Sequence, residues 1–174
     1  MLRASRRWLL PLIVSVVGLA VLALAAVAWR AFVHGLSDPS MPLAVGIRID
    51  GSRVSIKAPT CSTEAVDKVE VFDGESEKRL WEARAPRSPE GKRGALTLWA
   101  ADEYEFPGPG RQPTKLPKLL DVLLTEVGGD GGGGGSFDTA VVKRAKMSEG
   151  QYWTISGPMT AEAIDAQLRC EGGE

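Results

Sequence analysis

The chain contains very little histidine and cysteine. Its 174 residues include one histidine, His34, and two cysteines, Cys61 and Cys170. Histidine is the usual base of Ser-His-Asp and Cys-His catalytic sites and a common zinc ligand, and His34 lies only a few residues after a long apolar segment. The sequence therefore excludes a histidine-based catalytic or zinc site within residues 43–174, and we expect no catalytic residue, cofactor or metal there.

Charge is lacking altogether between residues 8 and 29, "WLLPLIVSVVGLAVLALAAVAW", and Arg3, Arg6 and Arg7 precede this segment. At 1.5 Å per residue, a helix of this length spans about 30 Å, the thickness of a bilayer core. A tryptophan stands at each end, where aromatic rings prefer the headgroup level. Residues 1–30 are therefore predicted to be a basic cytoplasmic stub and a transmembrane signal-anchor.

A cleaved secretory signal is the alternative for the same segment. Residues 26–28, Ala-Val-Ala, are typical of a cleavage site, and cleavage near Ala28 would release a secreted protein. Signal h-regions run to about 15 residues, whereas this one is longer and ends in Trp29-Arg30, which favours an uncleaved anchor. The excess of arginines before the segment places the N-terminus in the cytoplasm and residues 31–174 outside the plasma membrane.

The predicted exported part is acidic and holds both cysteines. Four of the 21 basic residues lie in the first 30, which leaves 17 against all 22 acidic residues, a net charge of −5. This sign speaks against nucleic acid as a partner. Because disulfides form outside the cytoplasm, we expect a bond between Cys61 and Cys170, with two buried free thiols as the alternative.

Beyond a linker at 31–42, the pattern predicts short strands. Val45, Ile47 and Ile49 alternate with polar residues or glycine, and the same pattern resumes after Asp50-Gly51, which indicates a hairpin with a tight turn. Six further segments have strand character: 68–73, 79–85, 94–100, 121–126, 139–144 and 151–156. Without helices between them, these segments predict an antiparallel sandwich of about seven to eight strands over residues 43–174. Tryptophans in three of the segments, Trp81, Trp99 and Trp153, are expected in its core.

The C-terminal segment 159–174 fits two structures. Ile164, Ala166 and Leu168 alternate with polar residues as in a strand. Thr160 is a suitable N-cap, however, and Gly172-Gly173 a suitable stop, so we expect a short helix that carries Cys170 to Cys61.

The stretch "GGDGGGGGSFD", residues 128–138, resembles a ligand loop only superficially. No lysine follows it, as a P-loop requires, and a single copy with Asp130 and Asp138 does not build a calcium-binding repeat. It is therefore expected to be a mobile connection between two strands.

A second long connection, 101–118, is rich in proline. Long loops in small domains often carry function, so this one is the candidate interaction loop, with a loop that only packs over a sheet edge as the alternative. Its candidate contact residues are Tyr104, Phe106, Arg111, Lys115 and Lys118.

The same loop carries the acidic residues Asp102, Glu103 and Glu105. Paired carboxylates serve as acid and base in glycoside hydrolysis, which makes an envelope hydrolase the alternative function. A structural spacer without a partner is a third.

Several short segments carry a resemblance: "APTC" (58–61), "LWEA" (80–83), "LTLWA" (96–100) and "IDAQLRC" (164–170), behind an arginine-led anchor. With them the chain resembles small single-pass membrane proteins of high-GC actinobacteria, and its strand pattern resembles immunoglobulin-like and fibronectin-like domains. The resemblance implies no catalytic residues. We therefore expect a membrane-anchored extracytoplasmic binding or protein-interaction module, an accessory subunit of a cell-envelope complex.

Overall fold

The computed structural model describes residues 43–129, 131–168 and 170. The chain divides into two units between Pro42 and Leu43, and the described residues all belong to the second. The predicted stub, membrane segment and linker lie outside the described residues. Within the described part, no helix is long and apolar enough to cross a membrane.

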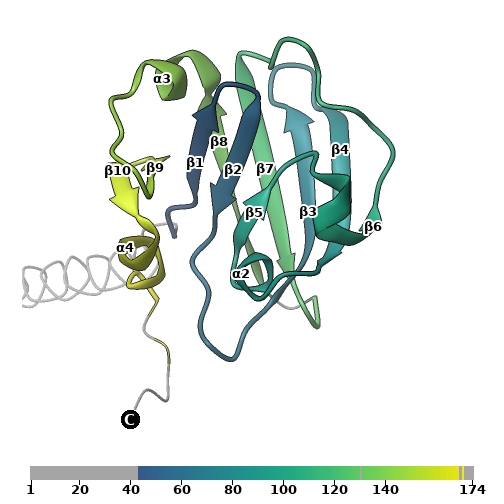
Figure 1. Cartoon of the computed structure of the whole chain (residues 1–174), viewed down its shortest axis with the longest axis vertical. Coiled ribbons are helices and arrows are strands. Elements are labelled where there is room, and N and C mark those ends of the chain that lie inside the picture. Colours follow the sequence, from purple (N-terminus) through teal and green to yellow (C-terminus); the bar gives the residue numbers. More distant parts are fainter. Residues whose placement is uncertain (1–42, 130, 169, 171–174) are drawn as a thin grey trace, which may run out of the picture. The chain divides into compact units, whose positions relative to one another are not determined.

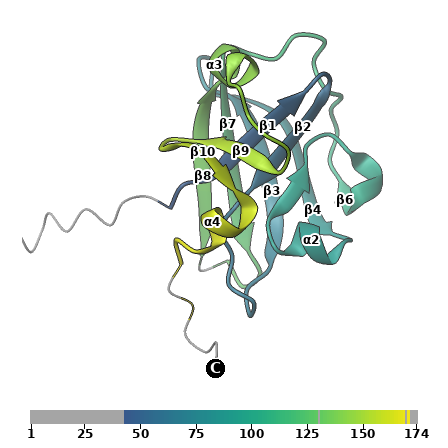
Figure 2. The same cartoon turned by 60° about the vertical axis from the view of Figure 1, so that its left-hand side comes forward.

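Two antiparallel five-stranded sheets lie face to face (Figures 1 and 2). The first has the order β10-β9-β1-β2-β5, built from β1 (Gly46–Asp50), β2 (Arg53–Lys57), β5 (Ala95–Thr97), β9 (Gln151–Thr154) and β10 (Gly157–Thr160). The second has the order β6-β4-β3-β7-β8, built from β3 (Val66–Asp73), β4 (Lys78–Pro86), β6 (Tyr104–Pro107), β7 (Leu119–Glu126) and β8 (Gly132–Asp138). The predicted mainly-β antiparallel sandwich is confirmed, with ten strands in the described residues instead of seven to eight.

The predicted hairpin is strands β1 and β2. Asp50 pairs with Arg53, which leaves Gly51 and Ser52 as a two-residue turn. Gly51 has a φ of 59°, a conformation that glycine adopts without steric cost.

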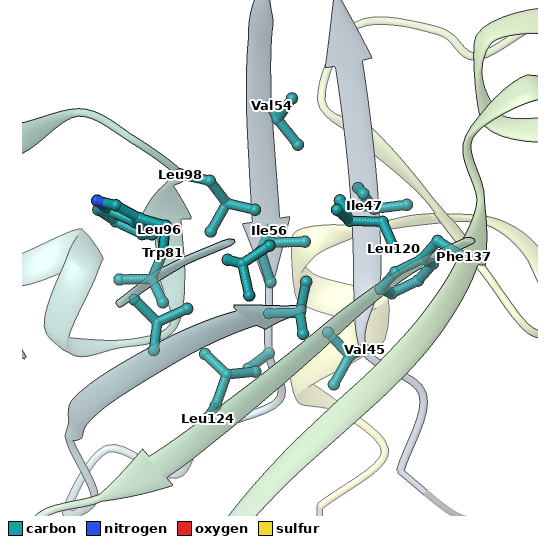
Figure 3. Close-up of a cluster of buried hydrophobic side chains, with 14 of the residues drawn as sticks. Val45, Ile47, Val54, Ile56, Trp81, Leu96, Leu98, Leu120, Leu124 and Phe137 are labelled. Atoms are coloured by element: carbon teal, nitrogen blue, oxygen red, sulfur yellow. The ribbon is translucent and has the colours of Figure 1, made fainter. Parts of the chain in front are cut away.

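The core lies between the two sheets (Figure 3). Ile47 and Ile56 are cross-strand partners in the first sheet, and both are fully buried. Val71 and Val122 are partners in the second sheet and are equally buried. Complete burial of one such side chain contributes about 1.5–3 kcal/mol. Trp81 belongs to this core as expected, whereas Trp99 and Trp153 are only partly buried at its margin.

In the described residues, four short helical segments join or follow the strands: α2 (Pro89–Lys92), the 3-10 helix η1 (Ala101–Glu103), α3 (Thr139–Arg144) and α4 (Ala161–Asp165). The prediction of a strand at 139–144 is wrong. The Asp138 carboxylate caps the segment by accepting hydrogen bonds from the N–H groups of Ala140 and Val141, at 2.9 and 3.0 Å. This cap and the burial of Val142 outweigh the strand preference of the two valines.

The prediction that residues 128–138 are only a connection between two strands is also wrong. Gly132–Asp138 form strand β8, which pairs with β7 from Leu119↔Asp138 to Thr125↔Gly132. It is not merely a connection, because the turn covers only the residues just after Glu126. Small residues are required at several of its positions: a Cβ on Gly135 would lie 2.6 Å from Cζ of Phe137.

The C-terminal segment begins as the predicted helix. Thr160 caps α4 through a 3.2 Å hydrogen bond from the N–H of Ala163 to its hydroxyl. The helix ends at Asp165. Cys170 is bonded to Cys61 with a Cα–Cα distance of 5.5 Å, which confirms the predicted disulfide pairing.

Candidate functional site

Segment 101–118 is only partly an irregular loop. It begins with η1, continues as edge strand β6 on β4, and runs without regular structure from Gly108 to β7. Leu116 is buried. The side-chain amide of Gln112 donates a hydrogen bond to the carbonyl of Ser52 in the β1–β2 turn, so the segment is fastened across the end of the sandwich (Figure 1).

The structure separates the candidate contact residues into two groups. Tyr104 is 1% exposed and packs edge-on against Trp81, with ring centroids 5.4 Å apart. Its hydroxyl donates to the carbonyl of Thr97 at 3.0 Å, and burial raises the pKa of its phenol. Tyr104 is thus a core residue and not available to a partner.

The other four candidates are exposed: Phe106 is 61% exposed, and Arg111, Lys115 and Lys118 lie on the surface. Phe106 faces outward although it lies two residues from Tyr104. It pairs with Arg84, whereas Tyr104 pairs with Pro86. Ala85, between those two partners, has a φ of 53°, and this turn of the backbone interrupts the usual alternation of faces.

An open depression of about 620 Å³ lies over the outer face of the first sheet. We call it the arginine groove; it is lined by Arg53, Ser55, Arg87, Ser88, Glu90, Ala95, Leu96, Thr97, Asp102, Glu103 and Tyr152. Arg53 lies between two partners, with a nitrogen 3.7 Å from a Glu103 oxygen and 3.0 Å from the Thr97 hydroxyl. The groove therefore offers charges of both signs and several hydroxyl groups.

The three candidate catalytic carboxylates do not converge in this groove. Asp102 and Glu103 line it, but Glu105 does not. The Glu103 carboxylate is engaged by Arg53 at 3.7 Å. The N–H of Arg87 donates to the Glu103 carbonyl at 2.9 Å and so holds η1 against the end of β4. The groove thus contains two of the three carboxylates, one of which is paired with an arginine.

A second depression, of about 510 Å³, lies at the end of the sandwich that carries α3. We call it the lysine pocket; it is lined by Glu75, Lys115, Leu116, Pro117, Lys118, Thr139, Ala140 and Lys143. Lys118 and Glu75 approach to 3.7 Å. Thr139 binds the segment twice, through its hydroxyl to the Pro117 carbonyl and through its N–H to the Lys118 carbonyl. Three lysines against one glutamate make the pocket positive within an acidic domain.

Sequence reasoning did not identify the residues that complete these two depressions, such as Arg53, Thr97, Tyr152 and Lys143. Alternation with Val54 and Ile56 does predict that Arg53 and Ser55 face solvent. Only the order of the strands shows that the same face continues over β5 and β9.

Metal-ligating side chains are not gathered in the described ranges: no three His, Cys, Asp or Glu side chains lie close enough to hold a metal ion. Comparison with known proteins finds no matching family model, no similar curated protein and no similar solved structure.

Proposed function

We propose that the chain is a membrane-anchored extracytoplasmic interaction module that binds a protein partner of the cell envelope through segment 101–118. The observation that carries this proposal is that the segment borders both open depressions. Its first residues, Asp102 and Glu103, line the arginine groove, and its last residues, Lys115 to Lys118, line the lysine pocket.

The surface that the segment presents is suited to a protein partner. Phe106 supplies an exposed aromatic side chain, and Arg111 a guanidinium, two residue types that are enriched in interfaces. The proline-rich backbone limits the conformational entropy lost when a partner binds. A spacer without a partner would require neither the exposed aromatic ring nor two polar depressions.

Cross-linking tests this proposal in intact cells of the source organism. A lysine-reactive reagent should join Lys115 or Lys118 to one partner in stoichiometric amount, identified by mass spectrometry. The variants Phe106→Ala and Arg111→Ala should reduce the yield of that link, whereas Lys92→Ala, an exposed control in α2, should not. A partner whose yield is the same in all variants, or cross-links between copies of the chain alone, would argue against this surface.

The proposed membrane anchor rests on the uncharged apolar sequence of residues 8–29. A separate experiment tests it. An uncleaved anchor keeps the protein in the membrane fraction after alkaline carbonate extraction, with the intact N-terminus detected by mass spectrometry. A soluble protein that begins just after Ala28 would show the cleaved form instead.

A further inference from the structure

Strand β8 is an edge of the second sheet with one side free. The strand order ends at β8, and within the described ranges no strand pairs with it except β7. Natural edge strands are usually protected by lysine, proline, a bulge or a covering segment. The sequence of β8, "GGGGSFD", contains neither lysine nor proline, and its pairing with β7 is regular throughout.

The register shows which backbone groups of β8 face away from β7. Thr139 N–H donates to the Lys118 carbonyl and Glu126 N–H to the Gly131 carbonyl, so even-numbered residues of β7 bond to odd-numbered residues of β8. Backbone groups alternate in direction along a strand. The N–H and C=O groups of Gly132, Gly134 and Ser136 therefore point outward, and no hydrogen bond to them is found in the described part of the chain.

A small acidic cavity opens beside the first residues of β8. We call it the carboxylate cleft; it has a volume of about 80 Å³ and is lined by Leu43, Ala58, Pro59, Thr60, Glu64, Val66, Leu124, Glu126, Gly132, Gly133 and Leu168. Glu126 lies against Gly131, where a side chain would collide with its carboxylate. Because Gly132 and Gly133 line the cleft, β8 places no side chain in its wall.

The cleft holds two carboxylates with no cation beside them in the described residues, where neither Glu64 nor Glu126 forms an ion pair. Burial raises the pKa of Glu126, and the nearby charge of Glu64 raises it further. Glu126 is half-buried and Glu64 is exposed, and two like charges this close together attract a cationic group. A lysine or arginine side chain has the charge and the slender stem that the cleft accepts.

We propose that an extended peptide segment with a lysine or arginine side chain binds to the free edge of β8 as a sixth strand of the second sheet. Its backbone would bond to Gly132, Gly134 and Ser136, and its basic side chain would enter the carboxylate cleft. This is β-strand addition, in which main-chain hydrogen bonds provide affinity and a side-chain site provides selectivity.

A second copy of the chain is a less suitable occupant of the same edge. Two β8 strands would pair with each other through their backbones, but β8 contains no basic residue and ends at Asp138. Such a dimer would leave the carboxylates of both clefts without a cation. A basic peptide compensates this charge, which is why we infer that the occupant is a peptide with a lysine or arginine.

Fluorescence anisotropy tests the proposal on the full-length chain in detergent. The probe is a labelled peptide, Thr-Val-Thr-Val-Lys-Val-Thr-Val-Thr, compared with the same peptide carrying norleucine in place of lysine. The lysine peptide should bind at least about tenfold more tightly. Glu126→Gln should remove most of this difference, because it leaves one carboxylate instead of two in the cleft.

A separate variant tests how much the backbone hydrogen bonds of β8 contribute to peptide binding. Ser136→Pro removes an outward N–H while the hydrogen bonds of β8 to β7 remain, since proline is tolerated where the N–H of an edge strand faces solvent. We expect it to weaken binding of both peptides at least about tenfold, whereas the control Ser136→Ala should bind as wild type. Unchanged urea unfolding of both variants shows that the fold is intact.

Equal binding of the two peptides, no binding of either, or full binding by Ser136→Pro would each overturn the proposal. Sedimentation of a dimer that Ser136→Pro converts to monomer would assign the edge to a second copy instead. The inference is independent of segment 101–118, so Lys115→Ala and Lys118→Ala variants should bind the peptide normally even if they lose their envelope partner.

Discussion

The ammonium of Lys57 in β2 lies 2.5 Å from the carboxylate of Asp165 in α4, 108 positions along the chain. Lys57 is only 3% exposed, and its other two donors bond to the carbonyls of Ala58 and Arg93, both at 2.8 Å. Asp165 also accepts the N–H of Thr60 at 3.1 Å. One ion pair thus joins helix α4, strand β2 and the segment that leads to Cys61.

Asp165→Ala is expected to lower the free energy of unfolding by about 1–3 kcal/mol, because it leaves the buried Lys57 ammonium with neutral hydrogen-bond partners only. Urea denaturation measures the change. Asp50→Ala is the control, since the Asp50 carboxylate pairs with Arg48 at the surface, where such pairs contribute about 0–1 kcal/mol. Equal losses in the two variants would show that burial of Lys57 does not strengthen its ion pair.

Reduction of the Cys61–Cys170 disulfide should lower the melting temperature. The bond closes a loop of 109 positions, for which the chain-entropy model gives about 4–5 kcal/mol. Calorimetry with and without reductant measures the shift, with Cys61→Ser/Cys170→Ser as the control that reductant no longer affects. Uptake of two alkylating groups by the unreduced protein would contradict the bond.

Replacement by alanine should affect stability differently at two glycines of β8 that face the core. A Cβ on Gly135 would lie 2.6 Å from the buried Phe137 ring, whereas one on Gly133 would lie 3.6 Å from Cγ2 of Val45, an ordinary contact. We expect Gly135→Ala to cost about 1–3 kcal/mol through overpacking and Gly133→Ala to change stability by less than about 1 kcal/mol. Urea unfolding of both variants checks the difference; equal effects would argue against this register of β8.

Stability should depend on pH through Glu126. Its pKa is raised above the ordinary value of 4.5 by burial and by Glu64, so the folded chain holds this proton more tightly than the unfolded chain. The resulting stabilisation is full below pH 4.5 and is lost as the pH rises through the folded-state pKa. Glu126→Gln, which stays neutral, should therefore be more stable than wild type near neutral pH, with little difference in acid.

Urea unfolding across this pH range measures the dependence for wild type and Glu126→Gln. Glu149→Gln, a change at an exposed position, serves as the control for loss of a charge. If wild type and Glu126→Gln differed in free energy of unfolding by the same amount at every pH, the pH dependence would not come from Glu126.

The local sequence pattern predicts the structure correctly where only one strong signal is present. Alternation around Asp50-Gly51 predicts the hairpin and its buried face, and the cap at Thr160 predicts where α4 begins. At 139–144 two local signals compete, the strand preference of Val141 and Val142 and the cap at Asp138. The segment forms a helix because the helical conformation satisfies the cap and still buries the side chain of Val142.

The sequence alone determined the class of the domain, since alternating apolar residues must bury one face and therefore stack two sheets. It also determined the cysteine pair, because only two cysteines are present. The tertiary structure decided that glycines 132–135 form a strand, that Tyr104 is buried while Phe106 is exposed, and which polar residues share a cavity. Glycine has no side chain to favour a strand, so its conformation follows from the partner β7. Likewise, the residues of a cavity come from distant segments that only the strand order brings together.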